Sequence, residues 1–226
     1  MANREIPTLD RYWNELDEAL PVFAPEEQRA AITLYRELAK GAPVTVGQFA
    51  KALDVPSTTA GELLGRDPFR KFVYPDPDGR VVGFGGLAVA PMHHRFEVGG
   101  RVLWTWCAWD GLFIPEILGD AARLGSSDPE TGETVRLTVA PGEITSVEPK
   151  TALVSFLLPD TREWGTAANV MANFCHFVFF FTSRGSGARW VARHDGTFLY
   201  SLEEAAELAR RANARNFGHE LGRRAA

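Results

Sequence analysis

The sequence predicts an α+β fold with an N-terminal winged-helix-like helical domain, residues 1–90, and a mixed α/β core, residues 91–226, with a mainly antiparallel sheet. Helix start and stop signals fill residues 25–64, whereas short apolar segments separated by brief turns dominate residues 96–157. Helices and strands that occur in separate stretches of a chain are typical of this fold class. With 226 residues, 45% of them hydrophobic, the chain is long enough to bury a substantial core.

Three helices are predicted in the first domain. The first covers residues 25–40, because Pro25 and two acids precede apolar residues at helical spacing and Lys40-Gly41 follows them. Thr45 can cap a second helix that runs to Leu53, and Ser57 can cap a third that runs to about Leu64. Together these segments predict a compact helical unit.

A β-hairpin is predicted directly after these helices. The sequence Pro-Asp-Pro-Asp-Gly at 75–79 is a turn signal between β-rich segments at 69–74 and 80–89. Three helices and a hairpin form the order of a winged helix, which suggests DNA binding. However, the third helix has no Lys or Arg before Arg66, and the net charge is -5. Since phosphate neutralisation needs basic side chains, we expect no nucleic-acid partner.

The second domain is predicted to follow a shift in composition at residues 90–94. A strand pair at 96–102 is hinged at Gly99-Gly100, and further strands are expected at 134–139, 144–147 and 151–157. Residues 174–182 are interpreted as a buried strand or a short helix-to-strand transition. The remaining predictions are helices at 107–113, 116–124 and 161–172, a loop at 125–132, and a C-terminal helix that Ser201 and Glu204 begin with a capping box.

Two cysteines are the main candidates for chemistry. Cys107 lies in Trp-Cys-Ala-Trp-Asp, and Cys175 lies in an aromatic segment. Asp110 follows Cys107 by three positions, so on a helix both side chains would share a face. Two soft sulfur ligands and one proton carrier suggest chemistry on a soft metal centre. The alternatives are that each cysteine is a small core residue and that Asp110 is a helix cap or ion-pair partner.

The histidines are weaker candidates. His176 adjoins Cys175, but adjacent residues on a strand face opposite ways, so a structural or solvent-facing role is favoured. The pair His93-His94 has no third ligand at recognisable spacing, and we expect it to be a loop at the domain junction.

The predicted location is the reducing cytoplasm. Residues 1–7 lack the basic start and apolar region of a signal peptide, and no apolar run approaches the ~18 residues of a membrane span. In that compartment two cysteines are expected to be thiols rather than a disulfide. We therefore expect no membrane association.

Several segments resemble the alkylmercury lyase (organomercurial lyase) family, in the same order along nearly the whole chain. They are Trp-Cys-Ala-Trp-Asp-Gly-Leu-Phe-Ile-Pro at 106–115, Ser-Asp-Pro-Glu-Thr-Gly at 127–132, Phe-Cys-His-Phe-Val-Phe-Phe-Phe-Thr-Ser at 174–183 and Ser-Leu-Glu-Glu-Ala at 201–205. Members of this family cleave the carbon–mercury bond by protonolysis, giving a hydrocarbon and Hg(II). The resemblance implies an organomercurial substrate.

The resemblance also implies roles for three residues. Cys107 and Cys175 would bind mercury, and Asp110 would transfer the proton and lie within the metal site. No bound cofactor is expected; external small thiols would act as co-substrate and remove the bound product Hg(II), which could pass to a mercuric reductase. Where many relatives carry a third cysteine, regarded as structural, this chain has Asp128. The segment after Cys175 is also more aromatic than the family's, which concerns substrate range more than reaction type.

Elementary chemistry favours the same assignment. Electron-rich sulfur weakens a carbon–mercury bond and leaves a carbanion that needs a proton. Burial of Asp110 near thiolate charge would raise its pKa, so that it could accept the Cys107 proton and deliver it to carbon. Two alternatives stay open: a non-catalytic protein that binds or senses a soft metal (Hg, Cu or an arsenical), and a winged-helix regulator whose second domain senses a ligand.

Overall fold

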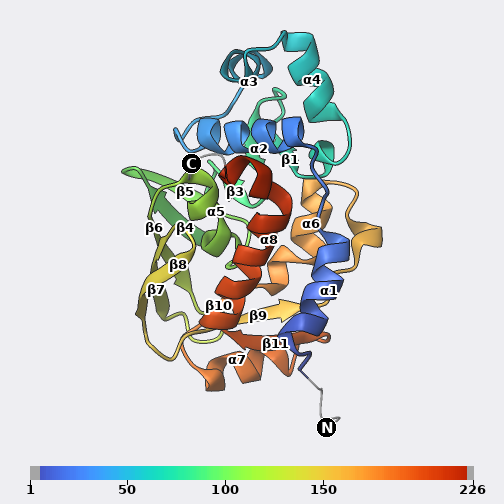
Figure 1. Ribbon diagram of the computed structural model, residues 1–226. Coiled ribbons are helices and arrows are strands. Elements are labelled where there is room, and N and C mark those ends of the chain that lie inside the picture. The colour runs from blue at the N-terminus through green and yellow to red at the C-terminus, as the bar shows by residue number, and fades with distance from the viewer. Residues whose placement is uncertain (1–5, 223–226) are drawn as a thin grey trace.

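A computed structural model describes residues 6–222 and shows helices packed around two β-sheets (Figure 1). The prediction that a signal peptide is absent rests on residues 1–7, and most of these lie outside the described range. The helices are α1 (Leu9–Ala19), α2 (Pro25–Leu38), α3 (Val46–Leu53), α4 (Ser57–Gly65), α5 (Asp110–Leu118), α6 (Ala167–Asn173), α7 (Arg184–Val191) and α8 (Leu202–Gly222). Short 3-10 turns are η1 (Phe69–Lys71), η2 (Thr161–Glu163) and η3 (Cys175–Phe177). None of the helices within residues 6–222 combines the length and apolarity that a membrane crossing requires.

The strands form two antiparallel sheets. The larger has the order β1-β2-β3-β5-β4-β6-β7-β8, and the smaller has the order β10-β9-β11. Their bounds are β1 (Val73–Pro75), β2 (Val81–Phe84), β3 (Leu87–Ala88), β4 (His94–Val98), β5 (Arg101–Thr105), β6 (Ala122–Ser127), β7 (Thr134–Ala140), β8 (Glu143–Glu148), β9 (Leu153–Leu157), β10 (Phe180–Phe181) and β11 (Thr197–Ser201). N-terminal helices followed by antiparallel sheets confirm the predicted α+β class.

The three predicted N-terminal helices are present as α2, α3 and α4. Thr45 caps α3 as expected: its hydroxyl accepts the Gln48 N–H, and the Gln48 side chain accepts the Thr45 N–H. The prediction for Ser57 is wrong, because α4 begins one residue earlier and Pro56 occupies its cap. Proline has the fixed φ of a residue that enters a helix, but it offers no hydroxyl to the free N–H groups.

The hairpin at 75–79 is confirmed, with Gly79 at φ +76° and the Asp76 carboxylate accepting the N–H groups of Asp78 and Arg80. The strand predicted at 80–89 is broken by the turn Gly85-Gly86 into β2 and β3. Both β2 and β3 belong to the same sheet as β4 to β8. The division of the chain at residue 90 stays a prediction.

Two helix predictions in the core are wrong. The helix expected at 116–124 ends at Leu118, because Gly119 takes a left-handed conformation at φ +75° and closes the helix. Residues 122–127 then form β6, whose side chains alternate between buried and exposed, so the predicted loop begins only after Ser127. The helix expected at 161–172 is the turn η2 followed by the short α6.

The long C-terminal helix α8 crosses the middle of the molecule and joins its parts (Figure 1). Its predicted capping box is present: Ser201 N–H donates to Glu204, and Glu204 N–H donates to the Ser201 hydroxyl. It contacts α5 and α2, and also α1, a helix the sequence analysis did not predict. Arg215 of α8 pairs with Asp17 of α1 and donates to the carbonyl of Pro21. The segment between α1 and α2 is thereby fixed to α8.

Candidate active site

Cys107 lies in the turn between β5 and α5. The Thr105 hydroxyl donates to the Cys107 carbonyl at 2.8 Å, and the Cys107 N–H donates to Oδ2 of Asp110 at 2.7 Å. The expectation that Cys107 begins a helix is wrong, since α5 begins at Asp110. The carboxylate of Asp110 instead turns back to accept a free N–H group ahead of the helix. The spacing of three residues brings the two groups together through this turn rather than along a helix face.

Cys175 lies in the turn η3, directly after α6. The segment agrees with the predicted helix-to-strand transition, because η3 is followed by the short strand β10. Val178 donates its N–H to the Cys175 carbonyl at 3.1 Å, and its own carbonyl accepts the Ala108 N–H at 3.0 Å. This pair of backbone bonds holds the two cysteine segments side by side.

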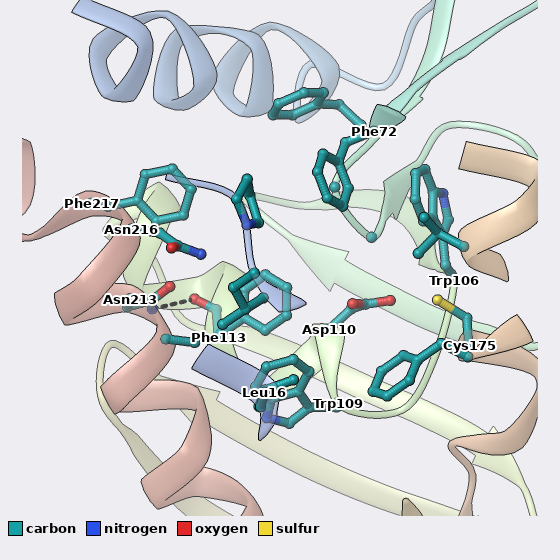
Figure 2. A pocket seen from close by; sticks show the side chains of 18 of the residues that line it. Leu16, Phe72, Trp106, Trp109, Asp110, Phe113, Cys175, Asn213, Asn216 and Phe217 are labelled. Atoms are coloured by element: carbon teal, nitrogen blue, oxygen red, sulfur yellow. Dashed lines mark hydrogen bonds between the residues drawn. The ribbon is translucent and has the colours of Figure 1, made fainter. Parts of the chain in front are cut away.

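The three predicted residues meet in one buried cluster. The two sulfur atoms and a carboxylate oxygen of Asp110 all lie within 4.8 Å of one another. The exposed fractions are 1% for Cys107, 6% for Asp110 and 4% for Cys175, and both cysteines are free thiols. Figure 2 shows the carboxyl group of Asp110 and the sulfur of Cys175 pointing toward each other. One metal ion can therefore reach both thiols after only small movements.

Burial controls the protonation of the cluster. It raises the pKa of the Cys107 thiol well above the ordinary value, with further contributions from Cys175 and the Asp110 carboxylate. A hydrogen bond with Cys107 lowers the pKa of Cys175, but burial and Asp110 outweigh it and raise this pKa overall. Burial raises the pKa of Asp110 to about 7, although hydrogen bonds from Cys107 and Trp106 oppose the shift. The resting thiols are protonated, and Asp110 can both accept and donate a proton near neutral pH.

A mostly apolar pocket leads to the cluster (Figure 2). It holds about 720 Å³ of space, including the part that opens to solvent. Asp110 and Cys175 line it, whereas Cys107 does not. No Lys, Arg or His is among the lining residues in the described chain. Ten aromatic residues line it: Phe23, Tyr35, Phe72, Phe84, Trp106, Trp109, Phe113, Trp164, Phe174 and Phe217.

The turn Gly85-Gly86 closes over Asp110, which the sequence analysis missed. A Cβ atom at Gly86 would lie 2.4 Å from Cγ of Asp110, and its φ of +99° also favours glycine. The Tyr35 hydroxyl of α2 donates to the Gly85 carbonyl at 2.6 Å, and the backbone N–H of Trp106 donates to the Gly86 carbonyl at 2.8 Å. A glycine pair inside an apolar strand pattern is the signal that could have indicated this close approach.

The histidine candidates lie outside the cluster. His176 is exposed, as expected. The prediction of a loop at His93-His94 is wrong for His94, which begins β4 and is buried with Nδ1 2.8 Å from the Ser126 hydroxyl. His94 pairs with Ser126 across β4 and β6, a cross-strand partner that the predicted loop at 125–132 does not provide.

Asp128, which the resemblance places where many relatives are expected to carry a cysteine, also lies outside the cluster. One carboxylate oxygen accepts the Thr182 N–H at 2.8 Å and the Thr182 hydroxyl at 3.0 Å, and the other accepts the Glu130 N–H at 2.8 Å. Burial raises the pKa of Asp128, but hydrogen bonds from Thr182, Ser186 and Glu130 outweigh it and lower the pKa overall. The ionised carboxylate joins the loop after β6 to the end of β10.

Two thiols beside a carboxyl group, shielded from water, form a site suited to a soft metal centre. The family model described as MerB, alkylmercury lyase, matches residues 87–213. The alkylmercury lyase of Streptomyces lividans is 40% identical over 177 residues, 78% of this chain and 78% of that protein. That of Staphylococcus epidermidis is 39% identical over 182 residues, 80% of each. The chain belongs to the alkylmercury lyase family.

The fold agrees with this assignment. A crystal structure of the mercury-bound form of MerB2 matches with a TM-score of 0.70 and 22% identity, covering 89% of this chain and 95% of that one. The predicted family, fold class and enzyme class, alkylmercury lyase, are thus confirmed.

Proposed function

We propose that the protein cleaves the carbon–mercury bond of organomercurials by protonolysis, with Cys107 and Cys175 binding mercury and Asp110 transferring the proton and lying within the metal site. The observation that carries the proposal is the placement of two free thiols and one carboxyl group within 4.8 Å in a buried cluster. Thiolates are the protein ligands that soft metals prefer. Once both sulfurs bind mercury as thiolates, Asp110 is the member of the cluster that can still carry a proton.

The first part of the reaction is capture of R–Hg⁺. Because Cys175 lines the pocket and Cys107 does not, we infer that Cys175 offers the accessible sulfur and Cys107 the second one. Each thiol must lose its proton to bind as thiolate. The Cys175 proton leaves with the small thiolate that Cys175 displaces from mercury. Asp110, whose carboxylate oxygen already accepts the Cys107 N–H, is placed to take the proton from the Cys107 thiol.

The second part is cleavage. Two sulfur ligands increase the electron density on mercury and weaken its bond to carbon. The bond breaks, its electron pair takes the proton from Asp110, and the hydrocarbon R–H leaves while Hg(II) stays on the two sulfurs. A pKa of about 7 suits a group that accepts a proton in one step and donates it in the next.

Product removal requires other molecules. We propose that external small thiols exchange with Cys107 and Cys175 for Hg(II), which then passes to a mercuric reductase. Free thiols that must stay reduced between turnovers support a cytoplasmic location.

The test is to incubate the purified, reduced protein with phenylmercury and excess small thiol and to follow benzene by gas chromatography. We expect many equivalents of benzene per protein, and loss of benzene in Cys107→Ser and Cys175→Ser. Retention of mercury without benzene, with both thiols reduced, would contradict the proposal and favour a non-catalytic binding protein.

A further inference from the structure

Helix α8 presents two buried amide side chains to the same pocket that holds Asp110 and Cys175. Asn213 and Asn216 are 1% and 6% exposed, and their spacing of three residues places them on one face of the helix. Figure 2 shows them across the pocket from Asp110 and Cys175, with Phe113 between. We propose that they form a polar subsite that binds a hydroxyl substituent on the organic group of the substrate. This inference rests on the proposed function.

The partners of Asn213 fix which amide atom is left for a ligand. Its Nδ2 donates to the Phe113 carbonyl at 2.9 Å and to the Glu116 carboxylate at 2.6 Å. Both partners are acceptors, so this atom is the nitrogen and the amide cannot be flipped. Oδ1 of Asn213 has no hydrogen-bond partner within residues 6–222 and is left as an acceptor.

In Asn216 the amide oxygen is the atom with a partner, and the nitrogen is left for a ligand. Its Oδ1 accepts Nη1 of Arg215 at 2.9 Å, and a guanidinium group only donates. Arg215 is itself held by Asp17 and the Pro21 carbonyl. Nδ2 of Asn216 therefore stays a donor without a partner among the described residues, and it points toward the pocket in Figure 2.

One free acceptor and one free donor on a helix face match a hydroxyl group, which both donates and accepts. The charge of the pocket selects a neutral substituent over an anionic one, because no cationic side chain of residues 6–222 lines it and Asp110 does. The rest of the wall is mostly apolar, so an organic group without a polar substituent leaves Oδ1 of Asn213 and Nδ2 of Asn216 without a partner. The amides thus distinguish substrates that the aromatic wall alone would treat alike.

The test compares 4-hydroxyphenylmercury with 4-methylphenylmercury, two substrates of nearly equal size, through kcat/KM in excess small thiol. Asn216→Leu keeps the branched shape and the number of heavy atoms but removes the donor. In this variant the kcat/KM for the hydroxyl substrate, divided by that for the methyl substrate, should fall about 3- to 10-fold, the value of one neutral hydrogen bond. Differences in intrinsic reactivity between the two rings cancel when variants are compared. Asn173→Leu, the same exchange outside the pocket lining, should leave the ratio unchanged.

The outcomes separate this inference from the proposed function. If Asn216→Leu does not fold, Asn216→Ala removes the same amide without a branched side chain, and its ratio must fall as well. An unchanged ratio in a folded, active Asn216 variant overturns the subsite but not the lyase. Failure of the wild-type protein to cleave either compound overturns the proposed function and the subsite with it.

Discussion

Gly86 lies so close to Asp110 that a single methyl group there would change the site. In Gly86→Ala the new Cβ atom would lie 2.4 Å from Cγ of Asp110, so the carboxyl group must move away from the cluster. We expect cleavage of phenylmercury to fall at least about 100-fold, since misplacement of a reacting group by about 1 Å has effects of this size.

A matched control for this change is Gly79→Ala. Gly79 has a similar positive φ, +76°, but no atom of residues 6–222 other than its own and those of its chain neighbours lies within 4 Å of its added Cβ. Both variants should lose about 1 kcal/mol of stability through backbone strain. Only Gly86→Ala should lose cleavage, and equal activity in the two variants would show that the turn does not position Asp110.

His94 gives the fold a sensitivity to acid. Its Nε2 is buried without a hydrogen-bond partner in the described part of the chain. Burial, with a further contribution from His93, lowers the pKa of His94 well below 6.5. Below pH 6.5 the unfolded chain binds a proton that folded His94 does not, so the free energy of unfolding falls as pH falls. The slope from this residue is at most about 1.4 kcal/mol per pH unit.

We expect His94→Gln to flatten that decline between pH 6.5 and 5 in urea titrations. The same exchange at exposed His176 controls for the loss of an imidazole as such. A decline as steep in His94→Gln as in the wild-type protein would contradict this account.

At the scale of elements, the pairing of the loop after β6 with the end of β10 depends on Asp128. Asp128→Ala leaves the Thr182 N–H without its partner in a buried position, which should cost about 1 to 3 kcal/mol of stability. Hydrogen exchange should speed up at Thr182, and Asp128→Asn, which keeps one oxygen acceptor, should lose less. Cleavage should persist in both variants, because Asp128 lies outside the thiol cluster.

Local sequence signals predicted the elements that depend on neighbouring residues, and missed those that depend on distant ones. The cap at Thr45, the capping box at Ser201 and the turn at 75–79 act within five residues, and all three are confirmed. In contrast, β6 is a strand because β4 and β7 pair with it, and its apolar pattern alone also fits a helix. Cys107 and Cys175 are 68 positions apart in the sequence, and only the resemblance to the family suggested that they meet.

At the scale of the whole molecule, α1 and the segment after it cover the pocket and are held by α8. Leu20, Pro21 and Phe23 line the pocket, and Arg215 donates to the carbonyls of Asp17 and Pro21. We expect Arg215→Gln to cost about 1.5 to 3 kcal/mol, the value of hydrogen bonds to a charged group.

Hydrogen exchange in this variant should rise most within residues 17–24. Arg210→Gln is the matched control, since Arg210 pairs within α8 with Glu207 and does not reach α1. Equal exchange at 17–24 in both variants would show that Arg215 does not fix the covering segment.

The central claim, that a buried carboxyl group beside two thiols protonates the mercury-bound carbon, is tested most directly at Asp110. Asp110→Asn keeps an oxygen that can accept the Cys107 N–H but cannot carry the transferred proton. The measurement is a single turnover with one equivalent of phenylmercury, in which benzene and protein-bound mercury are both quantified. The account predicts that the variant binds mercury like the wild-type protein and releases no benzene. Release of benzene at the wild-type rate would contradict it.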